Sequence, residues 1–141
     1  MKRISLIGIV ILLYSCSSIS TNKSNTPLYE VLTQQNDGGA SIRFFEILTE
    51  SKEIQMLLND DHLKKKINTN DIKTCNYIIL NLGEKSSTGY SIEITSIVET
   101  PDKIIIETKE KEPIGIIAEQ SEFVNPYSIV KINSKKEIVI K

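Results

Sequence analysis

The sequence is poor in the residues that enzymes use for chemistry. Among 141 residues it has no tryptophan, one histidine and two cysteines. The histidine, His62, lies in a strongly polar stretch, whereas Cys75 lies in an apolar one, so the two are not expected to form a nucleophile and its base. No nucleophile-elbow or phosphate-loop motif is present, and no cysteine or histidine group has the spacing of metal ligands. We therefore expect no catalytic residue, no metal site, no cofactor and no small-molecule substrate.

Arginine is scarce as well, because the 17 basic residues include only Arg3 and Arg43, and the net charge is −1. Arginine supplies the planar, bidentate donors that read phosphate groups. The one basic run, Lys64-Lys65-Lys66, fits a solvated helix end. Nothing in the sequence therefore favours nucleic acid as a partner.

The N-terminus combines positive charge with a short apolar run. Lys2 and Arg3 precede a mostly apolar stretch from Ile4 to Tyr14. This stretch is far shorter than the ~20 residues of a membrane-spanning helix, and it is typical of a removable export signal. The string Leu13-Tyr14-Ser15-Cys16 resembles a bacterial lipobox, which implies cleavage before Cys16 and a diacylglycerol linked to its sulfur. An ordinary secretory signal with an incidental cysteine, or a buried N-terminal helix, would explain the same residues.

The N-terminal pattern predicts the domain organisation. We expect residues 1–15 to be a lipoprotein signal peptide, residues 16–27 a flexible tether and residues 28–141 a single domain. Two or more acyl chains hold a protein stably on a membrane, so the N-terminal lipid is the expected membrane contact. The expected lipid anchor places the protein at the bacterial cell envelope. Because no acidic run follows Cys16, we expect the periplasmic face of the outer membrane and not the cell surface. Cys75 is then left without a disulfide partner and is expected to be buried.

Most of the domain has a hydrophobic period of two, which is typical of β-strands. Residues 28–33 and 41–48 are the first two candidate strands, and the turn residues Asn36 to Gly39 between them predict a hairpin. Residues 50–61 instead carry apolar side chains at i, i+3 and i+4, which predicts an amphipathic helix. Residues 68–73 are expected to be a loop.

Further strands are predicted in the rest of the domain. Residues 76–82 predict a strand buried on both faces, and residues 90–98 predict a half-buried strand with a bulge at Ile97-Val98. Residues 103–110, 127–133 and 137–140 complete the set. The expected fold is mainly β (α+β), an antiparallel β-sheet or sandwich of six or seven strands with one amphipathic helix.

Two connections are candidates for a binding role. Residues 84–90 predict a slim, protruding hairpin tip between Gly83 and the next strand, although a polar turn without a binding role explains the same chemistry. Residues 113–125 form a long irregular stretch. Its apolar side chains are expected to form either an exposed patch or a lid over the core; they are Ile114, Ile116, Ile117 and Phe123.

The wider pattern resembles the C-terminal domain of the PrcB family over residues 76–132. The matching pieces are Leu82-Gly83, Thr88-Gly89-Tyr90-Ser91-Ile92, Gln120, Pro126-Tyr127 and Ile129-Val130-Lys131-Ile132. The family commonly has two glycines before the tyrosine, so Thr88 stands in the place of the first glycine or is shifted by one. The family's named member is a lipoprotein subunit that associates with a secreted protease and supports its stability and maturation.

That resemblance implies a non-catalytic, lipid-anchored envelope protein that binds a secreted protease or another exported partner. The 84–90 tip is the expected contact. The residues expected to contribute are Ser87, Thr88, Gly89, Tyr90, Pro126 and Tyr127.

Residues 87–90 are also similar to the inserting loop of chagasin-like cysteine-protease inhibitors. This second resemblance implies an inhibitor of papain-like proteases that pushes Ser87 to Tyr90 into the cleft. The other two inhibitory loops of that family, a Gly-rich turn and an Arg-Pro-aromatic turn, are not found in the sequence. A third possibility is an envelope packing protein without a protease partner.

Overall fold

The structure, a computed structural model, describes residues 26–115 and 123–141. The predicted signal peptide, Cys16, most of the predicted tether and Gln120 lie outside these residues. The elements in chain order are β1 (Tyr29–Gln35), β2 (Phe44–Leu48), α1 (Ser51–Leu57), α2 (Asp71–Thr74), β3 (Asn76–Asn81), β4 (Ser91–Glu99), β5 (Lys103–Lys111), β6 (Tyr127–Ile132) and β7 (Glu137–Ile140).

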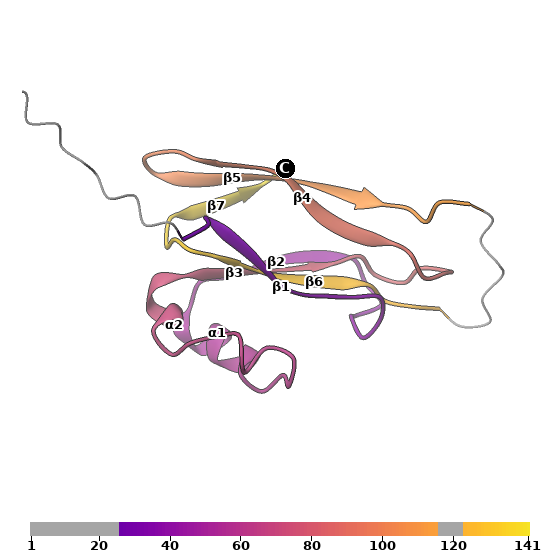
Figure 1. Cartoon of the computed structure of the whole chain (residues 1–141), viewed down its shortest axis with the longest axis horizontal. Coiled ribbons are helices and arrows are strands. Elements are labelled where there is room, and N and C mark those ends of the chain that lie inside the picture. The colour runs from indigo at the N-terminus through magenta and orange to yellow at the C-terminus, as the bar shows by residue number, and fades with distance from the viewer. Residues whose placement is uncertain (1–25, 116–122) are drawn as a thin grey trace, which may run out of the picture.

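Within the described residues, seven strands form two sheets that face each other (Figure 1). The first sheet has the order β1-β6-β3-β2 and the second β4-β5-β7. All pairs are antiparallel except β5 and β7, which run parallel. The prediction of a mainly β fold with six or seven strands is therefore confirmed, while the expectation of a wholly antiparallel sheet is wrong for β7.

The predicted hairpin between the first two strands is also wrong. β1 and β2 lie at opposite edges of the first sheet, and β6 and β3 lie between them. The physical reason is burial: the side chains of β3 and β6 are largely buried on both faces, so these strands take the centre, whereas β1 and β2 carry exposed side chains. The turn residues Asn36 to Gly39 therefore belong to a connection that crosses the end of the sheet.

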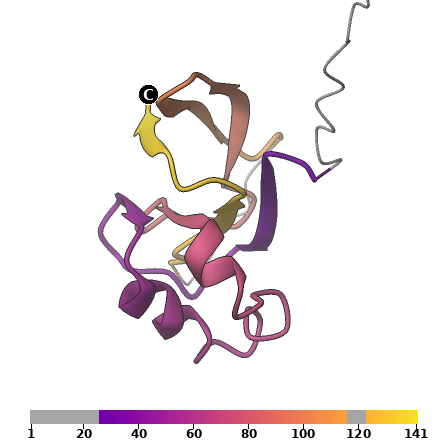
Figure 2. The ribbon, with the colours of Figure 1, turned by 90° about the vertical axis from the view of Figure 1, so that its left-hand side faces the viewer.

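Strand β3 separates two hydrophobic clusters. Ile78 and Leu80 belong to the cluster between the two sheets, which also contains Ile104 and Ile106 of β5. Tyr77 points the other way, into a cluster with Ile54 and Leu57 of α1. The molecule thus has three layers, with the helices on one face of the first sheet and the second sheet on its other face (Figure 2). The prediction that this strand is buried on both faces is confirmed.

The helical layer differs from the sequence prediction in two ways. α1 ends at Leu57 rather than near residue 61, and turns continue the chain to residue 66. The short helix α2 occupies the segment that was expected to be a loop. The Asp71 carboxylate stabilises its first turn, because it accepts the backbone N–H of Asn68 (3.1 Å) and pairs with Lys131 of β6 (2.8 Å).

The bulge in β4 lies slightly earlier than predicted. The register against β5 shifts between Ile94 and Ser96, just before the expected Ile97-Val98. The extra residue lets Ile94 and Ile97 both pack against the inter-sheet cluster. Cys75 is free and buried, as the sequence predicted. None of the described helices is long and apolar enough to cross a membrane.

Candidate partner-binding surface

Four connections meet at one end of the sandwich, on the right of Figure 1. They are residues 39–43, 83–90, 113–115 and 123–127, and we call them the loop end. Backbone hydrogen bonds join three of them: Glu84 N–H donates to the Ser41 carbonyl (3.0 Å), and Lys85 and Val124 exchange two bonds (2.8 and 3.0 Å). The loop end is thus a bonded platform, and it contains the contact residues that the sequence predicted.

Residues 84–90 are not the predicted hairpin tip. β3 lies in the first sheet and β4 in the second, so this segment crosses between sheets. Two glycines make the crossing possible, with positive φ angles of 72° at Gly83 and 97° at Gly89. A Cβ on Gly89 would lie 2.8 Å from Cβ of Pro113, so the segment packs against Pro113 instead of protruding alone.

The predicted contact residues differ in accessibility. Ser87 is 2% exposed, and Pro126 is buried at the start of β6. Tyr90 and Tyr127 are half-buried, each packed against one of the two hydrophobic clusters, and Thr88 and Gly89 are exposed. The structure brings all six to the loop end, and of the six only Thr88 and Gly89 are exposed; the role of the six in binding stays a prediction.

Asn81 shapes the loop end and was not singled out from the sequence. It is 1% exposed, and its Nδ2 donates to the carbonyls of Ala40 (2.8 Å) and Ile42 (2.7 Å), while its Oδ1 accepts from Ala40 N–H (3.0 Å). A Cβ on Gly39 would lie 2.2 Å from that Oδ1, so the loop needs glycine there. An asparagine at the end of an otherwise apolar run was the available signal.

A charged cluster joins the two sheets beneath this end. Glu110 of β5 accepts hydrogen bonds from Arg43 (2.5 Å) and Lys85 (2.5 Å). Burial alone would raise the pKa of Glu110, but the hydrogen bonds from these two cations outweigh it and lower the pKa below 4.5. Lys85 also lies 4.9 Å from the centre of the Tyr90 ring. The cluster holds the crossing segment in place and was not predicted.

Large apolar side chains are exposed on the same end. Ile42 is 77% exposed, Phe123 is 65% exposed, and Ile114 is fully exposed. For Ile114 and Phe123 the structure therefore supports the exposed patch and not the lid; Ile116 and Ile117 lie outside the described residues. Exposed apolar side chains grouped on one end are typical of a protein-binding surface.

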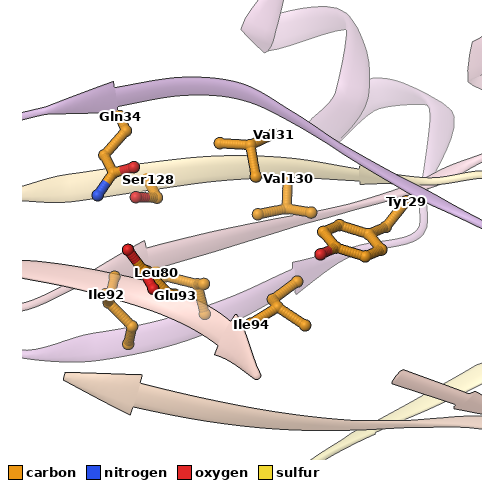
Figure 3. A pocket seen from close by; sticks show the side chains of 9 residues that line it. All are labelled: Tyr29, Val31, Gln34, Leu80, Ile92, Glu93, Ile94, Ser128 and Val130. Carbon is orange, nitrogen blue, oxygen red and sulfur yellow. The ribbon is translucent and has the colours of Figure 1, made fainter. Parts of the chain in front are cut away.

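A cavity of about 240 Å³ lies between β1 and β4, beside the loop end (Figure 3). Its walls come from both sheets. The lining residues are Tyr29, Val31, Gln34, Leu80, Ile92, Glu93, Ile94, Ser128 and Val130. The Ser128 hydroxyl is buried and has no hydrogen-bond partner in the described part of the chain.

The described residues show no arrangement for metal chemistry. No group of three or more histidine, cysteine, aspartate or glutamate side chains in residues 26–115 and 123–141 could hold a metal ion. His62 is exposed on the turns after α1, whereas Cys75 is buried and its thiol lies 3.4 Å from the Asn133 Oδ1.

Comparison with known proteins identifies one part of the chain. Residues 76–133 match the family model described as PrcB C-terminal. The match runs from the start of β3 to just past β6, and it includes the two glycines and the crossing segment of the loop end. Neither the curated proteins nor the solved structures gave a match.

Proposed function

We propose, from the match of residues 76–133 to the PrcB C-terminal family model, that the chain is a non-catalytic, lipid-anchored envelope protein. In this proposal it binds an exported protease, or another exported partner, through the loop end. The lipid on Cys16 holds it at the periplasmic face of the outer membrane.

The observation that carries the proposal is the exposure of Ile42, Ile114 and Phe123 on the loop end. In typical interfaces a few side chains, often aromatic, carry most of the binding free energy, as the loss of affinity on their truncation shows. The backbone bonds to Ser41 and Val124, together with Asn81, hold residues 39–43, 83–90 and 123–127 in one arrangement, which lowers the ordering cost of binding at these three connections.

The alternative function, insertion of residues 87–90 into a papain-like cleft, has less support. Ser87 is buried, Gly89 packs on Pro113, and Tyr90 packs against the inter-sheet cluster. Insertion would require the segment to leave these contacts. We therefore propose docking of the whole loop end and not insertion of one loop.

The test is co-purification of partners with a double variant, Ile42→Ser with Phe123→Ser. Both side chains are exposed, so the fold should remain while partner recovery falls at least tenfold. The matched control is Met56→Ser with Val98→Ser, which removes exposed apolar side chains from α1 and β4, outside the loop end. Equal loss in both double variants, or in neither, would reject the loop end as the contact.

Membrane anchoring is tested separately. Cys16→Ala removes the acylation site, so the variant should leave the membrane fraction. A Cys16→Ala protein that still fractionates with membranes would disprove the lipid anchor and leave the loop-end proposal standing.

A further inference from the structure

The cavity between β1 and β4 lies between two unpaired strand edges. Among the described strands, β1 pairs with β6 alone and β4 pairs with β5 alone. The outer edges of both strands therefore have backbone N–H and C=O groups available to another chain. An extended peptide can use such groups for main-chain hydrogen bonds while its side chains enter neighbouring pockets.

The bulge in β1 sets which side chains face the cavity. The register shift between Val31 and Thr33 places Val31 opposite Val130 and Gln34 opposite Ser128. All four line the cavity. A regular strand would have turned Gln34 to the other face, since side chains alternate along a strand. The bulge thus places the side-chain amide of Gln34 and the buried hydroxyl of Ser128 on the same wall of the cavity.

Ser128 is a polar residue on the otherwise apolar face of β6 that lines the cavity. The residues that share its face of β6, Val130 and Ile132, belong to the inter-sheet cluster, yet Ser128 places a hydroxyl there. The residue is 2% exposed, and the hydroxyl has no partner among the described residues. A buried polar group without a partner lowers stability, so this hydroxyl is suited to a ligand that hydrogen-bonds to it.

The lining combines polar and apolar side chains, and Gln34, Ser128 and Glu93 are grouped toward one end (Figure 3). In Figure 3 Ile92 and Leu80 also line the cavity at that end, and Val31, Val130, Ile94 and Tyr29 lie toward the other. Among the described lining residues, Glu93 is the charged one. It pairs with Lys111 (2.6 Å), but both side chains are about half exposed, and a carboxylate can accept several further donors.

These features define the chemistry of an occupant. The features fit a positive head that donates hydrogen bonds to Ser128 and Gln34 and lies near the carboxylate of Glu93, with an aliphatic stem that contacts the valines. Arginine and lysine have this combination. The volume is sufficient, because a cavity of about 150 Å³ already holds a benzene molecule in another protein.

We infer that the cavity binds a basic side chain, arginine or lysine, carried by an extended segment of a partner protein that lies along the open edges of β1 and β4. This site is separate from the loop end, and the inference does not require the partner to be a protease.

The test uses three capped tripeptides, Val-Arg-Val, Val-citrulline-Val and Val-norleucine-Val, titrated into the full chain and followed by NMR. Citrulline keeps the shape of arginine without its charge, and norleucine keeps only an aliphatic stem. We expect the arginine peptide to bind at least tenfold tighter than either, with shifts at Gln34, Glu93 and Ser128. Equal affinity for the three peptides, or shifts confined to other residues, would overturn the inference.

Variants separate binding from a structural role. Glu93→Gln should remove the preference for arginine over citrulline. Glu99→Gln is the matched control, since Glu99 lies on the same strand and pairs with Lys136 but does not line the cavity. Ser128→Ala should weaken the arginine peptide severalfold while raising the unfolding midpoint, because it deletes the unpaired hydroxyl. A cavity that serves only as a water site would leave peptide affinity unchanged in Ser128→Ala and Glu93→Gln, which would contradict the inference.

Discussion

The segment that matches the family, residues 76–133, and the flanking residues have different places in the fold. The family segment supplies β3 and β6, the centre of the first sheet, and β4 and β5 of the second. The flanks supply β1, β2 and β7 at sheet edges and the helices that cover Tyr77. The family segment thus holds the central strands of both sheets, and the flanks complete them.

Polar contacts across this boundary shape the loop end. Asn81 of the family segment binds the carbonyls of Ala40 and Ile42, and Glu110 binds Arg43. The exposed apolar side chains come from both parts too, with Ile42 from the flank and Phe123 from the family segment. The proposed binding surface is therefore built by residues of both the flank and the family segment, although the residues that match the family lie in the family segment alone.

The largest expected effect follows from cutting the family segment out. Residues 76–133 alone lose both edge strands of the first sheet, β7 and the helical layer, which leaves Tyr77 and Ile129 without cover. We expect this fragment to be unfolded, with poor amide dispersion in NMR, whereas residues 26–141 fold. A well-dispersed spectrum from the short fragment would show that the family segment folds without the flanks and would contradict this expectation.

Next in size are two matched core truncations. Ile54 in the flank and Ile104 in the family segment are both fully buried, in different clusters. Each change to alanine should cost about 2–5 kcal/mol of unfolding free energy. Since β3 contributes to both clusters, chemical denaturation should remain a single transition in both variants. Two separate transitions in Ile54→Ala would show that the flank folds independently.

Two glycines give a smaller contrast. A Cβ on Gly83 would lie 2.7 Å from the Arg43 backbone N, whereas a Cβ on Gly38 would lie 3.6 Å from its nearest neighbour, in the Tyr127 ring. Both have positive φ, so both alanine variants are strained. We expect about 3 kcal/mol for Gly83→Ala and about 1 kcal/mol for Gly38→Ala, measured by urea denaturation. Equal costs would mean that the crossing segment adapts more easily than its contacts suggest.

The smallest effect concerns two carboxylates that join the flanks to the family segment. Burial would raise the pKa of Asp71, but the hydrogen bond from Lys131 outweighs it and lowers the pKa below 3.8. Burial would likewise raise the pKa of Glu110, but the hydrogen bonds from Lys85 and Arg43 lower it below 4.5. A lowered pKa stabilises the fold above the unfolded-state value, and this stabilisation is lost as pH falls through the folded-state value. Asp71→Asn and Glu110→Gln should each cost about 1 kcal/mol at pH 7 and nothing at pH 2.

Denaturation curves at several pH values check this expectation. Wild-type stability should decline as pH falls from 5 to 2, and the decline should be shallower in each variant. A variant whose stability differs from the wild type by the same amount at every pH would show that the ion pair is not the cause.

The sequence predicted the strands well and their partners poorly. Alternation along residues 76–82 correctly indicated burial on both faces, because that pattern is local. Which strands pair is decided by distant residues, so the strong turn chemistry of Asn36 to Gly39 suggested a hairpin that the central position of β3 and β6 prevents. For the same reason, residues 84–90 resembled a hairpin although they cross between sheets.

The candidate site shows the same division. Gly89 was recognised from the sequence as a residue that permits a positive φ, because glycine is a local signal, and the structure confirms it; the positive φ of Gly83 was not predicted. The contact of Arg43 with Glu110 spans 67 positions and has no local signal. Ser87 could not be recognised as buried, because its environment is created by packing and not by its neighbours in the chain.

Site-specific photo-crosslinking in the producing cells tests the central claim most directly. A photoreactive residue at Phe123 should capture an exported protease or another exported protein, and one at Ile42 should capture the same partner. The same probe at Val98, equally apolar but on β4, should capture neither. Capture of that partner at Val98 but not at Phe123 or Ile42 would contradict the assignment of binding to the loop end.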